Sequence, residues 1–452
     1  MISLPVAVKE PYLNIKYQYP SHMQKFSLLV FLLFISASLI AQDEKGAIAQ
    51  ASYKKEITKL VAAKRIQNAF KIIQELEPET MKELIELTQI PAPPFAEQKR
   101  AARYKEMLEA AAIDSIWIDE VGNVVALRKG TGNGKTVVLE AHLDTVFPLE
   151  TDVTVKLRGD TLFAPGIGDD SRGLSMVLAV LKAMNKAEIK TASDILFIGV
   201  VGEEGLGDLR GVKHLFDKNK PKIDSYIAID GGDIGRINSM GLGSLRYKVT
   251  FKGPGGHSWG AFGLANPHHA MGKAIDYFNQ AAAVYVASGP KTTYNVGRIG
   301  GGTSVNSIPF ETWIEVDMRS ESPEKLKGVE RIFLEQMNKA LTDYNATVKT
   351  GAKLTTAFEK IGERPSGELA EGLPLIQKAL AATEYFKAKP LITRGSTNSN
   401  IPIALGVPAI TIGRGGKGGN AHSLDEWWMN DKGAEAIKLA LLILVAEAGL
   451  VN

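Results

Sequence analysis

The chain has 452 residues and a formal net charge of +3 at pH 7. So small a charge gives no argument for a nucleic-acid-binding surface, which needs a concentrated basic stripe. The chain contains no cysteine, which excludes disulfides, thiolate metal ligands and cysteine nucleophiles, so any metal ligands must be His, Asp or Glu. With 45% hydrophobic and 23% charged residues, the composition is that of a globular protein long enough for two cores.

Residues 1–41 are typical of an N-terminal extension that includes a secretory signal peptide. A short charged segment from Met23 to Lys25 precedes an apolar run from Phe26 to Ile40, and Ala41 is a small residue at a cleavage point. The apolar run is shorter than the roughly 20 residues that span a bilayer, so we favour a cleaved signal over an uncleaved membrane anchor. We therefore expect export to the periplasm or secretion, with no stable membrane span after cleavage.

Up to about residue 242, helical patterns alternate with short β-like runs. Helices are expected over 54–87 (interrupted near 79), 97–111 and 174–184, and strands over 115–118, 123–127, 137–141, 194–201 and 225–229. The run over 194–201 is continuously apolar, as in parallel strands that are covered on both faces. Helices separate the successive strands, which is the βαβ order of a mostly parallel sheet.

The pattern changes near Gly241. An alternating strand over 245–251 is followed by a helix over 266–286, strands over 293–299 and 312–318, and a helix over 323–344. From about residue 353 the first pattern returns, with a helix over 373–386, a strand over 408–412 and a closing helix over 432–448. We therefore predict an α/β fold, a mostly parallel sheet with helices on both faces, formed by residues 42–242 and 352–452. A small α+β lid or dimerisation domain is inserted over 243–351.

One β-like run, VVLEAHLDTV from Val137 to Val146, ends in a histidine and an aspartate. Strand alternation puts His142 and Asp144 on the same side. This spacing suits a metal-binding imidazole that is oriented by a nearby carboxylate. By itself the His-x-Asp pattern is a weak signal, because it arises by chance in many proteins.

Further acidic residues and a second histidine follow other predicted elements. They are Asp170, Glu203, Glu204, Asp230 and His422. Open α/β sheets carry their chemistry at the carboxyl ends of the strands, and burying such a cluster without cations would be very costly. Two divalent ions would resolve the repulsion. Taken singly, Asp170 could instead be a helix N-cap, and the adjacent glutamates could form a solvated acidic turn.

Taken together, these segments resemble the di-zinc exopeptidases, which include glutamate carboxypeptidase, peptidase T, succinyl-diaminopimelate desuccinylase and aminoacylase. The matching segments are His-x-Asp-Thr-Val at 142–146, Asp-x-(Lys/Arg)-Gly at 170–173, Glu-Glu at 203–204, Asp230, and His-Ser-x-Asp-Glu at 422–426. They are spread over essentially all of residues 80–452. One branch of the family uses a cysteine ligand, and the lack of cysteine argues against that branch.

The resemblance implies a role for each matched position. His142 and Asp230 would bind one Zn²⁺, and Glu204 and His422 the other; Co²⁺ or Mn²⁺ can substitute for zinc. Asp170 would bridge the two ions, with Asp169 as the second choice. Asp144 would orient His142, and Glu203 would be the general base.

The inserted domain carries matches of its own. The segment Gly253-Pro-Gly-Gly-His257-Ser resembles the lid segment whose histidine stabilises the tetrahedral oxyanion, often across a dimer interface. Asn306 and Arg319 resemble lid residues that hold the substrate carboxylate, although Arg319 could instead form an ordinary ion pair within its strand. Arg394, at the start of a glycine- and serine-rich loop, is a further substrate-binding candidate. In that loop Asn398 stands where many relatives have Asp, which bears on the substrate rather than on the metals.

The resemblance implies an exported di-zinc exopeptidase, namely an aminopeptidase, dipeptidase or tripeptidase that cleaves near a free terminus. An N-acyl-amino-acid deacylase or a carboxypeptidase is the alternative within the class. An inactive peptide-binding protein on the same scaffold is the alternative outside it. The expected ligands are short peptides or N-acyl amino acids, not nucleic acid, and the inserted domain is a candidate surface for a homodimer.

Overall fold

A computed structural model describes residues 45–132 and 134–451 of the chain. The expected signal peptide over 1–41 lies outside the described residues. Within the described part of the chain, no helix has the length and apolarity that crossing a membrane requires.

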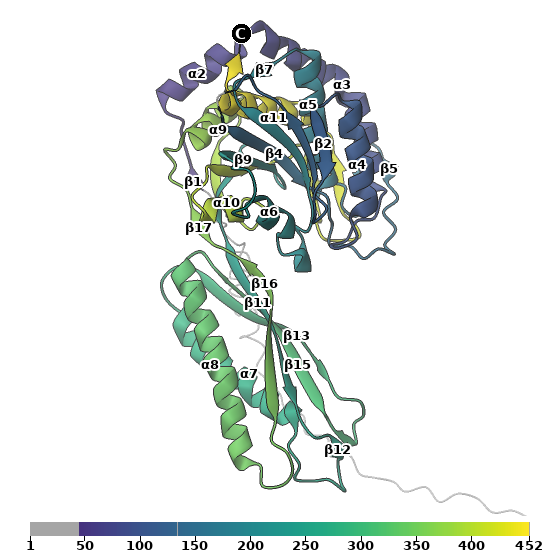
Figure 1. Cartoon of the computed structure of the whole chain (residues 1–452), viewed down its shortest axis with the longest axis vertical. Helices are drawn as coiled ribbons and strands as arrows, with labels where there is room; N and C mark the ends of the chain where they lie inside the picture. The colour runs from purple at the N-terminus through teal and green to yellow at the C-terminus, as the bar shows by residue number, and fades with distance from the viewer. Residues whose placement is uncertain (1–44, 133, 452) are drawn as a thin grey trace, which may run out of the picture. The chain divides into compact units, whose positions relative to one another are not determined.

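A mixed sheet lies at the centre of the larger domain (Figure 1). Its strand order is β1 (Lys45–Gly46), β18 (Leu391–Gly395), β10 (Arg236–Gly241), β19 (Ala409–Ile412), β9 (Ser225–Ile229), β4 (Thr136–His142), β8 (Asp194–Val200), β3 (Val124–Arg128) and β2 (Ser115–Ile118), with β17 (Gly367–Glu368) paired to β10. The adjacent strands β19, β9, β4 and β8 are all parallel, whereas β3 and β2 add antiparallel strands at one edge. The predicted α/β class with a mainly parallel central sheet is confirmed.

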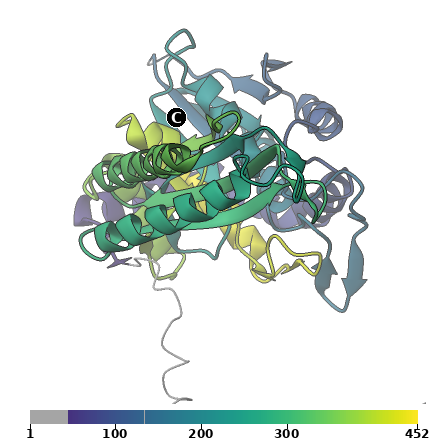
Figure 2. The ribbon, with the colours of Figure 1, turned by 90° about the horizontal axis from the view of Figure 1, so that it is seen from below.

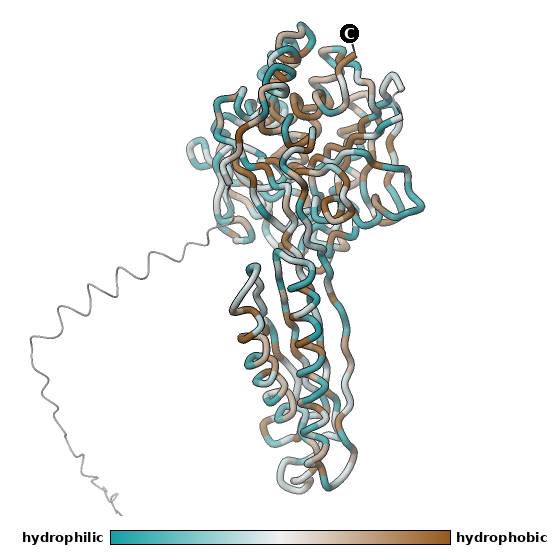
Figure 3. Tube along the Cα trace, turned by 90° about the vertical axis from the view of Figure 1, so that its left-hand side faces the viewer, coloured by the Kyte–Doolittle hydropathy of each residue, from teal (hydrophilic) through white to brown (hydrophobic). Residues whose placement is uncertain are grey.

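Helices cover this sheet because its central strands are apolar on both faces. The helices are α2 (Ala51–Val61), α3 (Lys64–Thr88), α4 (Gln98–Ala110), α5 (Ser171–Lys186), α6 (Arg210–Leu215), α9 (Pro374–Tyr385), α10 (Asn400–Ala404) and α11 (Gly433–Ala448), with a 3₁₀ turn at Gly205–Gly207. Both α5 and α11 pack against β4. Figure 3 shows apolar segments gathered among these strands and the helices that cover them. The helix α11 is buried around almost its whole circumference, which explains why its sequence lacks a polar stripe.

The helix predicted over 54–87 is two helices, and the break differs from the predicted one. It lies between Val61 and Lys64, whereas α3 continues through Pro78 without interruption. A proline inside a helix removes one backbone hydrogen bond. In α3 that loss is offset by packing against α5, since Leu76, Thr80 and Leu84 around the proline are all buried.

A smaller sheet brings two loops of the larger domain together. Its strands run in the order β20 (Lys417–Gly419), β21 (Trp427–Met429), β6 (Thr161–Phe163) and β5 (Lys156–Arg158). Because β21 pairs with β6, the loop between β20 and β21 lies beside the loop that follows β6. A short pair, β7 (Lys190–Thr191) and β22 (Leu450–Val451), fixes the end of the described chain.

The inserted domain has a four-stranded antiparallel sheet with its own core. The strand order is β13 (Thr292–Gly301), β15 (Glu311–Ser320), β11 (Gly243–Lys252) and β16 (Thr355–Arg364). Its helices, α7 (Pro267–Val286) and α8 (Pro323–Thr347), lie side by side over the sheet (Figure 2). A small ribbon of β12 (Gly256–His257) and β14 (Ser307–Ile308) lies at the end of the domain away from its junction with the larger one (Figure 1).

The inserted domain is longer than predicted, because residues 355–364 pair with β11 along almost its whole length. The predicted boundary at residue 351 therefore moves to Arg364. The strand β16 is an edge strand whose residues are mostly exposed or half-buried. Its sequence for this reason shows too little apolar alternation to be recognised as part of the lid sheet.

Candidate metal centre

Three neighbouring parallel strands bring acidic and histidine side chains to one edge of the sheet. His142 ends β4, Glu203 and Glu204 follow β8, and Asp230 follows β9. Since β4 pairs in parallel with both β8 and β9, the carboxyl ends of the three strands meet there. The small sheet supplies two more side chains, Asp169 from the loop after β6 and His422 from the loop between β20 and β21.

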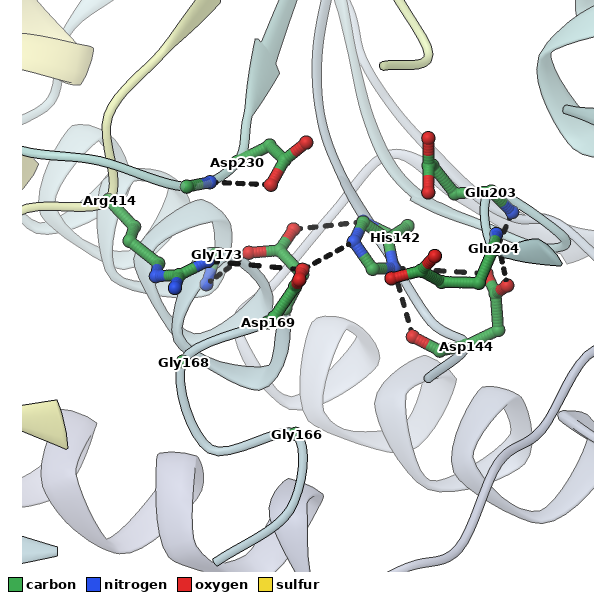
Figure 4. Close-up of polar contacts among 12 residues, drawn as sticks. His142, Asp144, Gly166, Gly168, Asp169, Gly173, Glu203, Glu204, Asp230 and Arg414 are labelled. Atoms are coloured by element: carbon green, nitrogen blue, oxygen red, sulfur yellow. Dashed lines mark hydrogen bonds and ion pairs between the residues drawn. The ribbon is translucent and has the colours of Figure 1, made fainter. Parts of the chain in front are cut away.

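Among the described residues, these side chains form three groups whose ligand atoms lie within 4.8 Å of one another. The groups are His142–Asp169–Asp230, Asp169–Glu204–His422 and His142–Glu203–Glu204. Nε2 of His142 lies 3.1 Å from Asp169 Oδ1, and Nε2 of His422 lies 3.2 Å from Asp169 Oδ2 (Figure 4 shows the first). One oxygen of the Asp169 carboxylate therefore faces His142, and the other faces His422.

Asp170, the predicted bridging residue, belongs to none of these groups. Its Oδ2 accepts a hydrogen bond from the backbone N–H of His142, and its Oδ1 accepts one from that of Gly173, each at 3.1 Å. Asp170 is thus the N-cap of α5, the alternative that the sequence left open. Asp169, the second choice, is the aspartate whose carboxylate belongs to two of the groups. The spacing to Arg172 and Gly173 identifies the motif but not which of two adjacent carboxylates faces the cluster.

Asp144 contacts both sides of the cluster, though not in the predicted way. Nδ1 of His142 donates to the backbone carbonyl oxygen of Asp144 at 2.9 Å, whereas the carboxylate is 3.8 Å from the same nitrogen. The carboxylate instead accepts from the backbone N–H groups of Glu203 at 2.9 Å and Glu204 at 2.7 Å. Asp144 therefore orients the imidazole through its main chain, which leaves Nε2 free to bind a cation, and positions the two glutamates through its side chain.

Glu203 is buried beside an arginine that the sequence analysis missed. Nη1 of Arg364 donates to Glu203 Oε1 at 3.0 Å and also to Ser396 Oγ at 3.1 Å, and Nη2 contacts the Glu203 carbonyl oxygen. Burial raises the pKa of Glu203 to about 8, although the Arg364 guanidinium opposes the shift and Glu204 adds to it. Arg364 ends β16, so only the pairing of that strand in the lid sheet brings it to the site.

Glu426 holds the loop that carries Asp169. The sequence had not singled out Glu426 as a site residue. The Glu426 carboxylate accepts hydrogen bonds from the backbone N–H groups of Gly166 at 2.7 Å, Gly168 at 2.9 Å and Asp169 at 2.9 Å. Burial raises the pKa of Glu426 to about 7. A signal was available, since Glu426 closes the His-Ser-x-Asp-Glu segment that the resemblance singled out.

The donor set fits divalent cations. His422 lies 2.9 Å from Glu204 Oε1, and its hydrogen bonds to Asp169 and Glu204 raise its pKa to about 10, which shows how strongly this edge favours positive charge. Imidazole nitrogens mixed with carboxylate oxygens suit zinc, cobalt or manganese. Each of two groups offers three ligands and shares one carboxylate, and three protein ligands would leave a position open on a bound ion, as in catalytic zinc sites.

The lid residue His257 ends β12, and Asn306 directly precedes β14, its partner strand. The backbone N–H groups of Trp259 and Gly260 donate to Nδ1 of His257, each at 3.2 Å, which leaves Nε2–H as an outward donor. The backbone carbonyl of Asn306 accepts from Ser258 N–H at 2.9 Å. Both His257 and Asn306 are exposed, and neither belongs to the three ligand groups.

The two predicted substrate-binding arginines have partners within the fold. Nε of Arg319 donates to Asp317 Oδ2 at 2.7 Å, which is the ion pair within the strand that the sequence left open. Nη2 of Arg394 donates to Glu368 Oε2 at 3.0 Å, and its Nη1 donates to the Gly241 carbonyl at 3.3 Å. Arg394 thus links β18 to β17 and β10. Its role in substrate binding stays a prediction.

Comparison with known proteins identifies similarity over the region that carries the site. The family model described as "Peptidase family M20/M25/M40" matches residues 138–446, which include every candidate ligand. The chain is 25% identical over 350 residues to succinyl-diaminopimelate desuccinylase of Corynebacterium glutamicum, covering 75% of this chain and 89% of that protein. In fold it is similar to aminopeptidase PepT from Bacillus cereus (TM-score 0.64, 20% identity, 82% of this chain and 98% of that one). The di-peptidase Dug1p from Saccharomyces cerevisiae is likewise similar (TM-score 0.65, 16% identity, 84% and 98%).

Proposed function

The chain belongs to the peptidase family M20/M25/M40, and on that premise we propose that it is an exported exopeptidase dependent on two zinc ions. The observation that carries the proposal is the position of Asp169, which belongs to two ligand groups at once. One ion would be held by His142, Asp169 and Asp230. The other would be held by Asp169, Glu204 and His422.

In this proposal the protein's own groups handle the proton. Two divalent cations bound there would polarise the scissile carbonyl and acidify a water at the cluster. The Glu203 carboxylate, grouped with His142 and Glu204 within 4.8 Å, takes a proton from the attacking water and passes it to the leaving nitrogen. Asp144 fixes the position of that carboxylate by holding the Glu203 backbone N–H. Arg364 keeps one carboxylate oxygen oriented.

His257 would act on the site of a second copy of the chain. Its free Nε2–H suits hydrogen bonding to the oxyanion that forms when the carbonyl is attacked. Within its own chain it lies at the far end of the inserted domain, next to large exposed apolar side chains, of which Trp259 is 87% and Phe262 is 91% exposed. An apolar surface of this kind favours an interface between copies of the chain.

The substrate is proposed to be a di- or tripeptide with a free terminus. The names of structurally similar proteins, an aminopeptidase and a di-peptidase, support this class. A deacylase remains the second candidate, because the related sequences include a desuccinylase and an N-acetylcysteine deacetylase of Bacillus subtilis. Asn306 and Arg319 on the lid are proposed to contact the substrate, with Arg319 exchanging its partner Asp317 for the substrate carboxylate.

The test is a substrate panel with a matched pair of variants. Protein stripped by a chelator and reloaded with zinc, cobalt or manganese is assayed on free and blocked di- and tripeptides and on N-acetyl amino acids. We expect peptide hydrolysis, and a loss of about 10²–10⁴-fold in kcat for Glu203→Gln with two bound metals retained. Glu120→Gln, which changes a glutamate whose side chain is 73% exposed, is the control and should keep full activity.

Each other result points to a different function. Cleavage of the acyl compounds alone would replace the peptidase by a deacylase. Two tightly bound metals with no hydrolysis of any substrate would favour the peptide-binding protein.

A further inference from the structure

An arginine lies beside the metal centre without being one of its ligands. Arg414 follows β19, and its loop runs beside Asp230 because the Asp230 backbone N–H bonds to the carbonyl of Ile412 at 3.1 Å. Nη1 of Arg414 lies 3.9 Å from Asp169 Oδ1. In Figure 4 its guanidinium points from the Asp230 side toward Asp169, the carboxylate shared by the two ligand groups.

A glycine in the loop of Asp169 leaves the space that this side chain occupies. A Cβ atom on Gly168 would lie only 2.9 Å from Nη2 of Arg414, whereas one on Gly231 would lie at an ordinary contact distance of 3.7 Å from Nη1. Gly168 is in the loop that presents Asp169, and Gly231 follows Asp230 directly. The backbone on the Asp169 side of the centre is therefore shaped around the guanidinium, and Arg414 is only 9% exposed.

The guanidinium acts on the cluster by charge and not by hydrogen bonding. Nη1 of Arg414 is buried and has no hydrogen-bond partner among the described residues, and 3.9 Å is beyond hydrogen-bond length. Arg414 thus occupies no lone pair of Asp169. Beside Asp169, the carboxylates of Asp170, Asp230 and Glu426 also interact electrostatically with the guanidinium. A hydrogen-bonded arginine would instead compete directly for the Asp169 oxygens.

We propose that Arg414 is a positioning residue that serves as the built-in counter-cation of the metal centre, an inference that rests on the proposed function. Before cations bind, its charge holds the repelling carboxylates at the strand ends together. Once cations bind, the same fixed charge opposes them, so Arg414 lowers the affinity of the centre for metal. The chain thereby gains a preformed site in the absence of metal and gives up some affinity in its presence.

The test compares metal affinity with the stability of the metal-free protein. Arg414→Met and Arg414→Gln remove the charge, and Arg414→Lys keeps it. Zinc affinity is measured by competition with a chromogenic chelator at fixed pH, and Tm is measured in excess chelator. We expect both neutral variants to bind zinc at least about tenfold more tightly. At an effective dielectric of ~20, the repulsion between two unit charges a few ångström apart corresponds to more than a tenfold change in affinity. We also expect both to have a lower metal-free Tm than the wild type.

A merely structural role would not raise affinity, so the sign of the change decides the matter. Arg172→Met is the control, because Arg172 is a buried guanidinium (0% exposed, against 9% for Arg414) that stacks on Trp428 and donates to the Gly433 carbonyl. It should lower the Tm with and without metal and leave zinc affinity unchanged. Unchanged or weaker zinc binding in the neutral Arg414 variants, or tighter zinc binding in Arg172→Met, would overturn this inference and leave the proposed function standing. A wild-type protein that binds no zinc would overturn the proposed function itself.

Discussion

Asp169 and Asp170 carry the same functional group one residue apart, yet they face different partners. Asp169 lies within reach of His142 and His422, whereas both oxygens of Asp170 accept backbone N–H groups. An aspartate at a helix N-cap satisfies donors that would otherwise be unpaired. Both oxygens of Asp170 are therefore used by the helix cap and by β4, so Asp169 is the aspartate with oxygens that can bind cations.

This division predicts opposite outcomes for two neighbouring substitutions. Asp169→Asn should reduce zinc to at most one tightly bound ion per chain, because it removes the charge shared by both ligand groups. Asp170→Asn keeps a side-chain oxygen for the N-cap and should keep two ions. Metal content after dialysis, measured by mass spectrometry, distinguishes the two. The reverse ranking would restore Asp170 as the bridge.

At the scale of the elements, β4 combines a metal ligand with a buried carboxyl group. Glu140 lies two residues before His142, is 1% exposed, and accepts a hydrogen bond from Asn398 Nδ2 at 3.2 Å. Burial raises its pKa to about 8, with His142 opposing the shift. A central parallel strand is covered on both faces, so no water reaches this carboxyl group to stabilise its charge.

The raised pKa makes the stability contribution of Glu140 depend on pH. The folded state holds the Glu140 proton up to about pH 8, whereas an unfolded chain loses it near its model value of 4.5. Stability from this group is therefore complete below the unfolded value and is lost as the pH rises through that window. Glu140→Gln cannot ionise, so in excess chelator its Tm advantage over the wild type should grow from pH 5 to about pH 8. A constant difference across that range would contradict the assignment.

At the scale of the whole molecule, the metal centre and His257 lie on different domains of the chain. If His257 serves the centre of a second copy, each copy is incomplete alone, and the two defects should complement each other. The Glu203→Gln and His257→Ala variants should both be nearly inactive. A mixture refolded in equal amounts should recover about a quarter of wild-type activity. Half of the randomly formed dimers contain one subunit of each kind, and in each of these only one of the two sites has both Glu203 and a partner's His257. No recovery, or a fully active monomer in sedimentation, would contradict the proposal.

Much of the site followed from local sequence because its side chains lie at the ends of strands. The apolar runs that end at His142, before Glu203 and before Asp230 were recognisable, and parallel pairing then brought these residues to one edge. Features that depend on distant contacts were not recognisable. Arg364 reaches Glu203 across 161 residues of sequence, from an edge strand with no clear pattern of its own.

The sequence by itself determined the α/β class, the existence of an inserted domain and most members of the ligand cluster, since hydrophobic period and strand ends are local properties. Only the tertiary structure decided which of two adjacent aspartates faces the cluster, where the lid ends, and that Arg364, Glu426 and Arg414 surround the site. Such choices depend on which backbone N–H groups and cations the fold brings to each carboxylate. A single segment does not contain that information.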